Sequence, residues 1–163
     1  MIDKEIIRIA SNTENHGALE SHTHSSKLKN SICGDDMKIY LVVENDKITN
    51  FKYECESCIY CQASVSLLSR KAKNKSIEKV KNFAQQANDY FDKNTNSFDK
   101  EWKEFDKIMT KNNIPRKECL LLPINTMLDA LSKKSLGNLK KYFVGLHYWA
   151  VSVQESQLLF LHI

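Results

Sequence analysis

The clearest pattern along the chain is a pair of short segments that favour β-strands. Residues 37–43 are apolar and rich in β-branched side chains, and residues 48–53 alternate apolar with polar positions. Such segments suit strands, in which successive side chains point to opposite faces. Residues 44–47 between them are typical turn residues. The pattern therefore predicts a β-hairpin.

The segments before this hairpin give weaker signals. Residues 1–10 alternate charged and apolar side chains, which predicts a short amphipathic helix, and residues 12–17 are typical of a turn. Residues 18–30 are polar with weak alternation, which is at most the pattern of an edge strand.

After the hairpin the apolar spacing changes to that of helices. Ile59, Ala63 and Leu67 recur every four residues, which predicts a helix over residues 58–73. Ser76 is a favoured N-cap residue for a second helix. The apolar face of this second helix consists of Ile77, Val80, Ala84, Ala87 and Phe91.

A third helical pattern follows a break at residues 92–96, and it is rich in aromatic side chains. Ser97 is placed to cap this helix. Its apolar face consists of Phe98, Trp102, Phe105, Ile108 and Met109. Aromatic residues at this spacing belong to a core more often than to a cofactor site, so we expect them to be buried.

The last clear pattern is a helix after Cys119. Residues 111–116 are expected to form a loop, because the residue before Pro115 is pushed out of helical geometry. Pro123 is tolerated in the first turn of a helix, which places Cys119 at or just before the helix N-terminus. Gly137 is expected to end this segment. The whole pattern predicts an α+β fold, with a small antiparallel sheet of about three strands packed against four to five helices.

Length and composition narrow the class of protein. The chain has 163 residues, which suits one domain with a real core, and its formal net charge is only +4. Its Lys and Arg residues are spread over the predicted helices, so nucleic acid is not an expected partner. The opening residues carry charges unlike a signal peptide, and the apolar stretch near residues 142–153 is too short to span a bilayer. We therefore expect a cytoplasmic protein without a membrane partner.

Five cysteines carry the candidate chemistry. Cys55, Cys58 and Cys61 lie close together, whereas Cys33 and Cys119 are distant in sequence. In a reducing compartment such thiols favour metal or sulfur chemistry over disulfides. The alternative is that they are scattered buried thiols, which behave as small apolar side chains.

The predicted hairpin suggests which thiols meet. A hairpin brings its two ends together, so Cys33 at the entrance is expected near Cys58 at the exit. Cys119 joins them if the last helix packs its N-terminus against the same end, and a thiol at a helix N-terminus is expected to have a lowered pKa. Asp35 projects to the same side of an extended chain as Cys33. Three thiolates and one carboxylate suit tetrahedral Zn²⁺, or an incomplete cysteine set for an iron–sulfur cluster.

The three neighbouring cysteines suggest two local alternatives. The spacing of Cys55, Cys58 and Cys61 resembles a bacterial ferredoxin run, but the fourth Cys and its following Pro are missing. Cys58 and Cys61 also have the spacing of a dithiol redox motif, without the βαβ context that such motifs have.

Three motifs together resemble the IscU/SufU/NifU N-terminal-domain family of iron–sulfur cluster assembly scaffolds. They are Cys33-Gly34-Asp35 before a hairpin, Cys58-Ile59-Tyr60-Cys61-Gln62-Ala63-Ser64-Val65-Ser66, and Arg116-x-x-Cys119-Leu120-x-Leu122. The chain departs from the pattern where Ser31 replaces a usual Pro and Cys61 replaces a Ser, and Cys55 is additional. The resemblance covers residues 1–134 as a scaffold domain and leaves residues 135–163 as a C-terminal extension of unknown role.

Within this family the chain looks more like the SufU branch. Arg116 stands three residues before Cys119, and the long gap after Cys58 has room for the insertion of that branch, near residues 90–110. The IscU branch normally has a His just before its third Cys and a Leu-Pro-Pro-Val-Lys chaperone-binding motif. Here Glu118 precedes Cys119 and residues 114–117 replace that motif.

The resemblance implies both a function and its residues. A pyridoxal-phosphate-dependent cysteine desulfurase of the SufS or IscS type would pass persulfide sulfur to Cys33 or Cys119. A labile [2Fe–2S] cluster would then assemble on Cys33, Asp35, Cys58 and Cys119 and pass to downstream apo iron–sulfur acceptor proteins. Two alternatives use the same residues: a SufU-like zinc-dependent sulfurtransferase, and a domain in which Zn²⁺ is purely structural.

Overall fold

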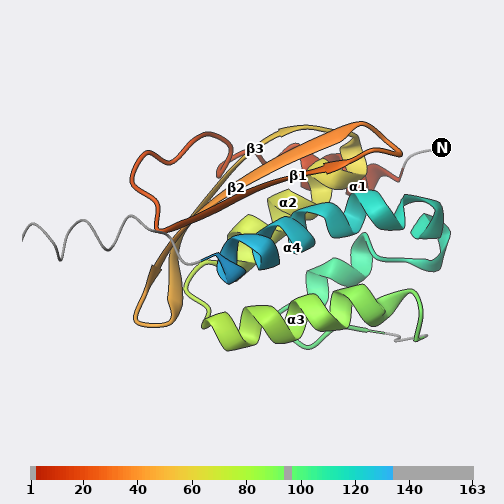
Figure 1. Ribbon diagram of the computed structural model, residues 1–163. Coiled ribbons are helices and arrows are strands. Elements are labelled where there is room, and N and C mark those ends of the chain that lie inside the picture. The colour runs from red at the N-terminus through yellow and green to blue at the C-terminus, as the bar shows by residue number, and fades with distance from the viewer. Residues whose placement is uncertain (1–2, 94–96, 134–163) are drawn as a thin grey trace, which may run out of the picture. The chain divides into compact units, whose positions relative to one another are not determined.

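The computed structural model describes residues 3–93 and 97–133. Within them lies a three-stranded antiparallel sheet in the order β1-β2-β3, whose strands are His24–Asn30, Asp35–Glu44 and Lys47–Glu56. Helices α2 (Ile59–Ala72) and α4 (Lys117–Ser132) lie along one face of this sheet (Figure 1). The predicted α+β fold is confirmed.

The β2–β3 hairpin is confirmed and extends beyond the predicted segments. Glu44 pairs with Lys47, so Asn45 and Asp46 form a two-residue turn, and both have positive φ angles of 48° and 59°. Asn and Asp tolerate this left-handed geometry better than most residues, which explains their place in the turn. The weakly predicted edge strand is present as β1, but it begins only at His24.

The predicted helices on either side of the hairpin are also confirmed. Helix α1 spans Lys4–Ala10, and α2 begins directly after its N-cap, Cys58. Helix α3 spans Ile77–Tyr90, and its N-cap Ser76 accepts a hydrogen bond from the Lys79 N–H. On the predicted face of α3, Val80, Ala84 and Ala87 are buried, whereas Ile77 and Phe91 are half-buried.

The prediction of an α-helix after Ser97 is wrong, although its apolar residues are all buried. The segment forms turns and one 3₁₀ helix, η1 (Lys103–Lys107). Asp106 accepts hydrogen bonds from the Phe98 N–H at 2.9 Å and the Ser97 hydroxyl at 2.8 Å, which folds the segment back on itself. Trp102 stacks on Phe83 of α3 with ring centroids 4.0 Å apart. The apolar spacing thus predicted which residues are buried but not the conformation of the backbone between them.

The start of the last helix also differs from expectation. Residues 111–116 form a second 3₁₀ helix, η2 (Lys111–Arg116), instead of a loop. Helix α4 begins at Lys117, so Cys119 lies inside its first turn and Pro123 lies in the second. The interior proline is tolerated at the cost of one backbone hydrogen bond, because Pro123 has no N–H to donate to the Cys119 carbonyl.

The helices and the sheet share one core. Fully buried side chains come from α1, the inner face of the sheet, α2, α3, the segment around η1, and α4. Among the residues that the structure describes, no helix is both long and apolar enough to cross a membrane. Gly137 and the predicted extension at 135–163 lie outside the described residues.

Candidate metal and sulfur site

Cys33 lies in the tight turn between β1 and β2. Asn30 pairs with Asp35 across this turn, and the Gly34 N–H donates to the Asn30 carbonyl at 2.8 Å. Gly34 has a φ of +72°, the left-handed geometry that glycine adopts without steric cost. The turn presents Cys33 to solvent.

Asp35 joins the start of β2 to the start of α2. Its side chain is buried, and its Oδ1 accepts the Cys58 N–H at 2.7 Å. The Cys58 thiol also donates to Asp35 Oδ2 at 3.6 Å. Cys58 has no side-chain capping bond of its own, so Asp35 supplies a carboxylate at the N-terminus of α2. The predicted meeting of the two ends of the hairpin is therefore present.

Cys119 reaches the same place from α4. It is fully buried, and its sulfur lies 3.1 Å from the sulfur of Cys33. One ligand atom each from Cys33, Asp35 and Cys119 lies within 4.8 Å of the other two. Cys58 stands beside this group through its two contacts with Asp35. The structure thus gathers the four sequence-predicted residues from three separate parts of the chain.

The donor set fits the groups that the sequence suggested. Ligands about 2.3 Å from a tetrahedral zinc ion stand about 3.8 Å from one another. The 3.1 Å sulfur–sulfur contact and the 4.8 Å limit of the group bracket that value. Three thiols with one carboxylate also match a cysteine-based iron–sulfur site in which one ligand is an oxygen.

The Cys119 thiol differs from the expectation of a lowered pKa at a helix N-terminus. Burial raises the pKa of the Cys119 thiol, and its contacts with Cys33, Asp35 and Cys58 raise that pKa further. Arg116 is a positive group beside the thiols, and its own pKa is raised mainly by a hydrogen bond to Cys33. The Arg116 guanidinium also lies over the Tyr60 ring, 5.5 Å from its centroid. Without a bound cation, burial therefore favours the protonated form of the Cys119 thiol.

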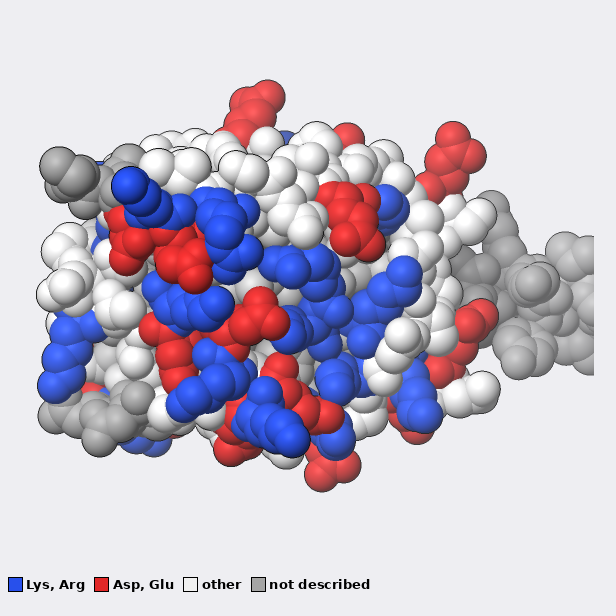
Figure 2. Space-filling view, turned by 180° about the vertical axis from the view of Figure 1, so that it is seen from behind, with Lys and Arg blue, Asp and Glu red and all other residues white. Residues whose placement is uncertain are grey.

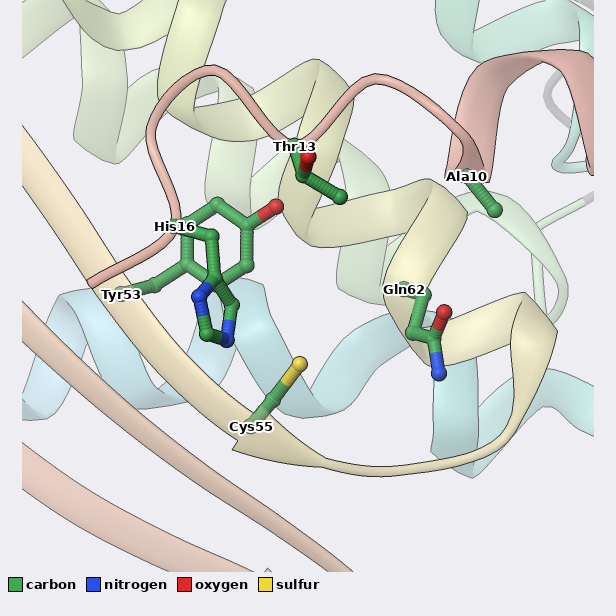
Figure 3. A pocket seen from close by; sticks show the side chains of 6 residues that line it. All are labelled: Ala10, Thr13, His16, Tyr53, Cys55 and Gln62. Atoms are coloured by element: carbon green, nitrogen blue, oxygen red, sulfur yellow. The ribbon is translucent and has the colours of Figure 1, made fainter.

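Cys55 and Cys61 do not join this group. Cys61 is fully buried in α2, and burial raises the pKa of its thiol. Cys55 points into a separate cavity of about 370 Å³, where His16 and Gln62 are among its neighbours (Figure 3). Over residues 3–93 and 97–133, no metal-binding group comprises the three neighbouring cysteines, so the ferredoxin-like spacing gains no support.

Asn30 also belongs to the site, although the sequence patterns did not predict a functional role for it. It is buried, its Oδ1 accepts the Ile32 N–H at 3.0 Å, and its Nδ2 donates to the Cys119 sulfur at 3.8 Å. Its only signal in the sequence is its position three residues before Cys33. Glu118, which stands where the IscU branch has a His, is exposed on the first turn of α4.

Charged side chains of both signs lie side by side on part of the surface. Figure 2 shows Lys and Arg intermingled with Asp and Glu on one face of the molecule. Several lysines pair with acids of the segment around η1, including Lys71 with Glu104 and Lys75 with Glu101. This mixed surface agrees with the spread of basic residues seen in the sequence.

Known proteins resemble the chain in sequence and in fold. The family profile described as NifU-like N terminal domain matches residues 1–93. An iron–sulfur cluster assembly scaffold protein IscU of Thermotoga maritima is 27% identical over 136 residues, which cover 83% of this chain and 95% of that protein.

Two solved structures extend this likeness to the fold. A NifU-like protein N-terminal structure from Brucella abortus has a TM-score of 0.75 at 19% identity, covering 80% of this chain and 91% of that one. A putative iron–sulfur cluster assembly scaffold protein for the SUF system, from Fervidobacterium islandicum, has a TM-score of 0.72 at 25% identity, covering 80% and 96%. Because the family profile spans more than half of the sequence, the chain belongs to the NifU-like N-terminal domain family.

Proposed function

We propose that this protein is an assembly scaffold for iron–sulfur clusters that accepts sulfur from a cysteine desulfurase. The observation that carries the proposal is the gathering of Cys33, Asp35 and Cys119 within 4.8 Å, with Cys58 in contact with Asp35. Membership of the family supports it, because a relative that spans most of the chain is named an iron–sulfur cluster assembly scaffold protein.

Cys33 is the better placed sulfur acceptor of the two candidates. It is exposed on a turn, whereas Cys119 is fully buried behind it. In the transfer, the Cys33 thiolate attacks the outer sulfur of the desulfurase persulfide. A new S–S bond forms at Cys33, the S–S bond on the desulfurase breaks, and the desulfurase cysteine leaves as a thiolate. The 3.1 Å contact then allows Cys119 to take the sulfur onward by the same exchange.

The four residues would hold a [2Fe–2S] cluster as cargo. Three cysteine ligands leave one position to Asp35, and a carboxylate binds iron less tightly than a thiolate does. Such a site suits a cluster that must later move to an apo acceptor protein. The cluster lies where the exposed turn at Cys33 gives a partner access.

Zinc is the alternative occupant, and the donor set favours it equally. Cys33, Asp35, Cys58 and Cys119 are a plausible tetrahedral zinc set, and a bound zinc ion would hold the thiols as thiolates. The protein would then be a sulfurtransferase of the SufU kind, or, if the zinc only stabilises the fold, a structural zinc domain.

Transfer of radiolabelled sulfur separates the two sulfur-accepting functions from a structural zinc domain. The reduced protein is incubated with radiolabelled cysteine and a pyridoxal-phosphate-dependent desulfurase, and label bound to the chain is measured before and after thiol reduction. We expect reducible label on the parent and on Cys55→Ala, and its loss in Cys33→Ala. Absence of label on a folded parent, with or without zinc, would contradict the proposal and leave the structural zinc domain.

A further inference from the structure

We propose that Asn30 is a positioning residue that holds the Cys119 sulfur ready to bind metal. The inference rests on the proposed site at Cys33, Asp35, Cys58 and Cys119. It assigns to Asn30 a role through Cys119, not a direct contact with the metal or cluster.

The contacts of Asn30 link two parts of the site. Its Oδ1 accepts the Ile32 N–H at 3.0 Å and its backbone carbonyl accepts the Gly34 N–H at 2.8 Å, so it shapes the turn that carries Cys33. Its Nδ2 reaches the Cys119 sulfur at 3.8 Å, across 89 positions of sequence. One side chain therefore holds the Cys33 turn and contacts the sulfur of α4.

The bond to sulfur has a chemical consequence as well as a structural one. Asn30 is buried, so its side-chain amide is shielded from water. The hydrogen bond from the Ile32 N–H to its Oδ1 orients the amide N–H group. A hydrogen bond to an ionised acceptor is stronger than one to a neutral acceptor. The amide is therefore placed to donate its strongest hydrogen bond when the Cys119 sulfur is a thiolate, which is the form that binds metal.

Two substitutions separate the turn from the bond to sulfur. Asn30→Asp and Asn30→Ser both keep a side-chain oxygen that can accept the Ile32 N–H, because Asp and Ser form the same local turn contacts. Asp replaces the donor by a negative oxygen, and Ser is too short to reach Cys119. Asn12→Asp is the matched control, because Asn12 Oδ1 accepts the Glu14 N–H two residues on in the same way.

Cobalt(II) is the probe, since its absorption reports directly on thiolate ligands. Each reduced protein is titrated with cobalt(II) under anaerobic conditions, and the thiolate-to-cobalt absorption and the dissociation constant are recorded. Circular dichroism and urea unfolding check the fold of each variant.

We expect both Asn30 variants to bind cobalt roughly 10–100-fold more weakly than the parent, the usual cost of losing such a supporting contact. We also expect their charge-transfer absorption to move to longer wavelength, because a thiolate without the hydrogen bond is easier to oxidise. Asn12→Asp should behave as the parent.

The outcomes distinguish the inference from the proposed function. If the parent and Asn30→Ser share the same spectrum and affinity, the positioning role is wrong while the metal site stands. Weaker binding with an unchanged absorption energy would reduce Asn30 to a support for the turn and overturn the proposal. A parent without any thiolate-to-cobalt absorption would overturn both the site and the role of Asn30.

Discussion

Cys33 and Cys119 differ in their access to solvent although their sulfur atoms lie 3.1 Å apart. Cys33 is on an exposed turn, and Cys119 is buried in the first turn of α4. Under the proposed function, this arrangement would give different tasks to two chemically identical groups. The exposed Cys33 thiol would meet the partner protein, and the buried Cys119 thiol would receive the sulfur that Cys33 has accepted.

The difference predicts unequal reaction with an alkylating reagent. In the reduced, metal-free protein, Cys33 is expected to be alkylated well before Cys119, because burial both shields Cys119 and raises its pKa. Peptide mass spectrometry over a time course measures the two rates. In urea the two rates should converge, and equal rates in the native protein would contradict the arrangement described above.

The sequence motifs predicted the four proposed ligand residues but not Asn30, the residue that contacts one of them. Cys33, Asp35, Cys58 and Cys119 are distinctive residue types in distinctive motifs, so they are visible without a structure. The role of Asn30 depends on α4 lying beside β1, and no local pattern reports that packing. The raised pKa of Cys119 was missed for the same reason, because burial is a property of the folded chain.

At the scale of elements, the site is a junction of one strand, one turn and two helices. Asp35 is the connection between β2 and α2, through its hydrogen bonds with the N–H and the thiol of Cys58. It is both a proposed ligand and the capping group of α2. These two tasks predict different responses to two substitutions.

Asp35→Ala and Asp35→Asn should separate capping from ligation. Ala removes the acceptor for the Cys58 N–H and is expected to lower the free energy of unfolding by about 1.5–3 kcal/mol, the range for a hydrogen bond to a charged group. Asn keeps an acceptor oxygen, so it should retain most of that free energy. Both variants should bind metal more weakly than the parent.

Urea unfolding and zinc titration of the two variants measure these effects. Asp36→Asn is a control on the neighbouring residue, whose carboxylate pairs with Lys27 and Lys29 at the surface. If Asp35→Asn bound zinc as tightly as the parent, Asp35 would not be a ligand.

Helices and strands were predicted correctly where the local residue pattern determines the backbone conformation. The β2–β3 hairpin and helices α1 to α3 follow from alternation, four-residue spacing and the Ser76 cap. The segment around η1 does not, because the Asp106 side chain closes it and Phe83 buries its aromatic rings. Pro123 was misplaced because packing of the long apolar α4 outweighs one missing hydrogen bond.

At the scale of the whole molecule, the segment around η1 belongs to the core but lies outside the site. Phe83 contacts the rings of Phe98, Trp102 and Phe105, which fixes this segment against α3. The proposed site draws its residues from the β1–β2 turn, β2, α2 and α4 instead. A substitution in the segment around η1 is therefore expected to change the stability of the fold without changing metal binding.

Replacement of Trp102 tests this separation. Trp102→Ala removes a buried ring and is expected to lower the free energy of unfolding by about 3–5 kcal/mol. Below its melting temperature the variant should bind zinc with the same stoichiometry as the parent. Lys100→Ala, at an exposed position of the same segment, should leave both properties unchanged. Loss of zinc binding by folded Trp102→Ala would show that the segment supports the site.

The central claim is that a cluster assembles on Cys33, Asp35, Cys58 and Cys119, and anaerobic reconstitution tests it most directly. The reduced parent and the variants Cys33→Ala, Cys58→Ala, Cys119→Ala and Cys55→Ala are incubated with ferrous iron, cysteine and a cysteine desulfurase. Iron, sulfide and the visible spectrum are then measured for each folded protein. The parent and Cys55→Ala should bind iron and sulfide in equal amounts with the absorption of a [2Fe–2S] cluster, and the other three should not. If those three variants load iron and sulfide like the parent, the proposed site is wrong.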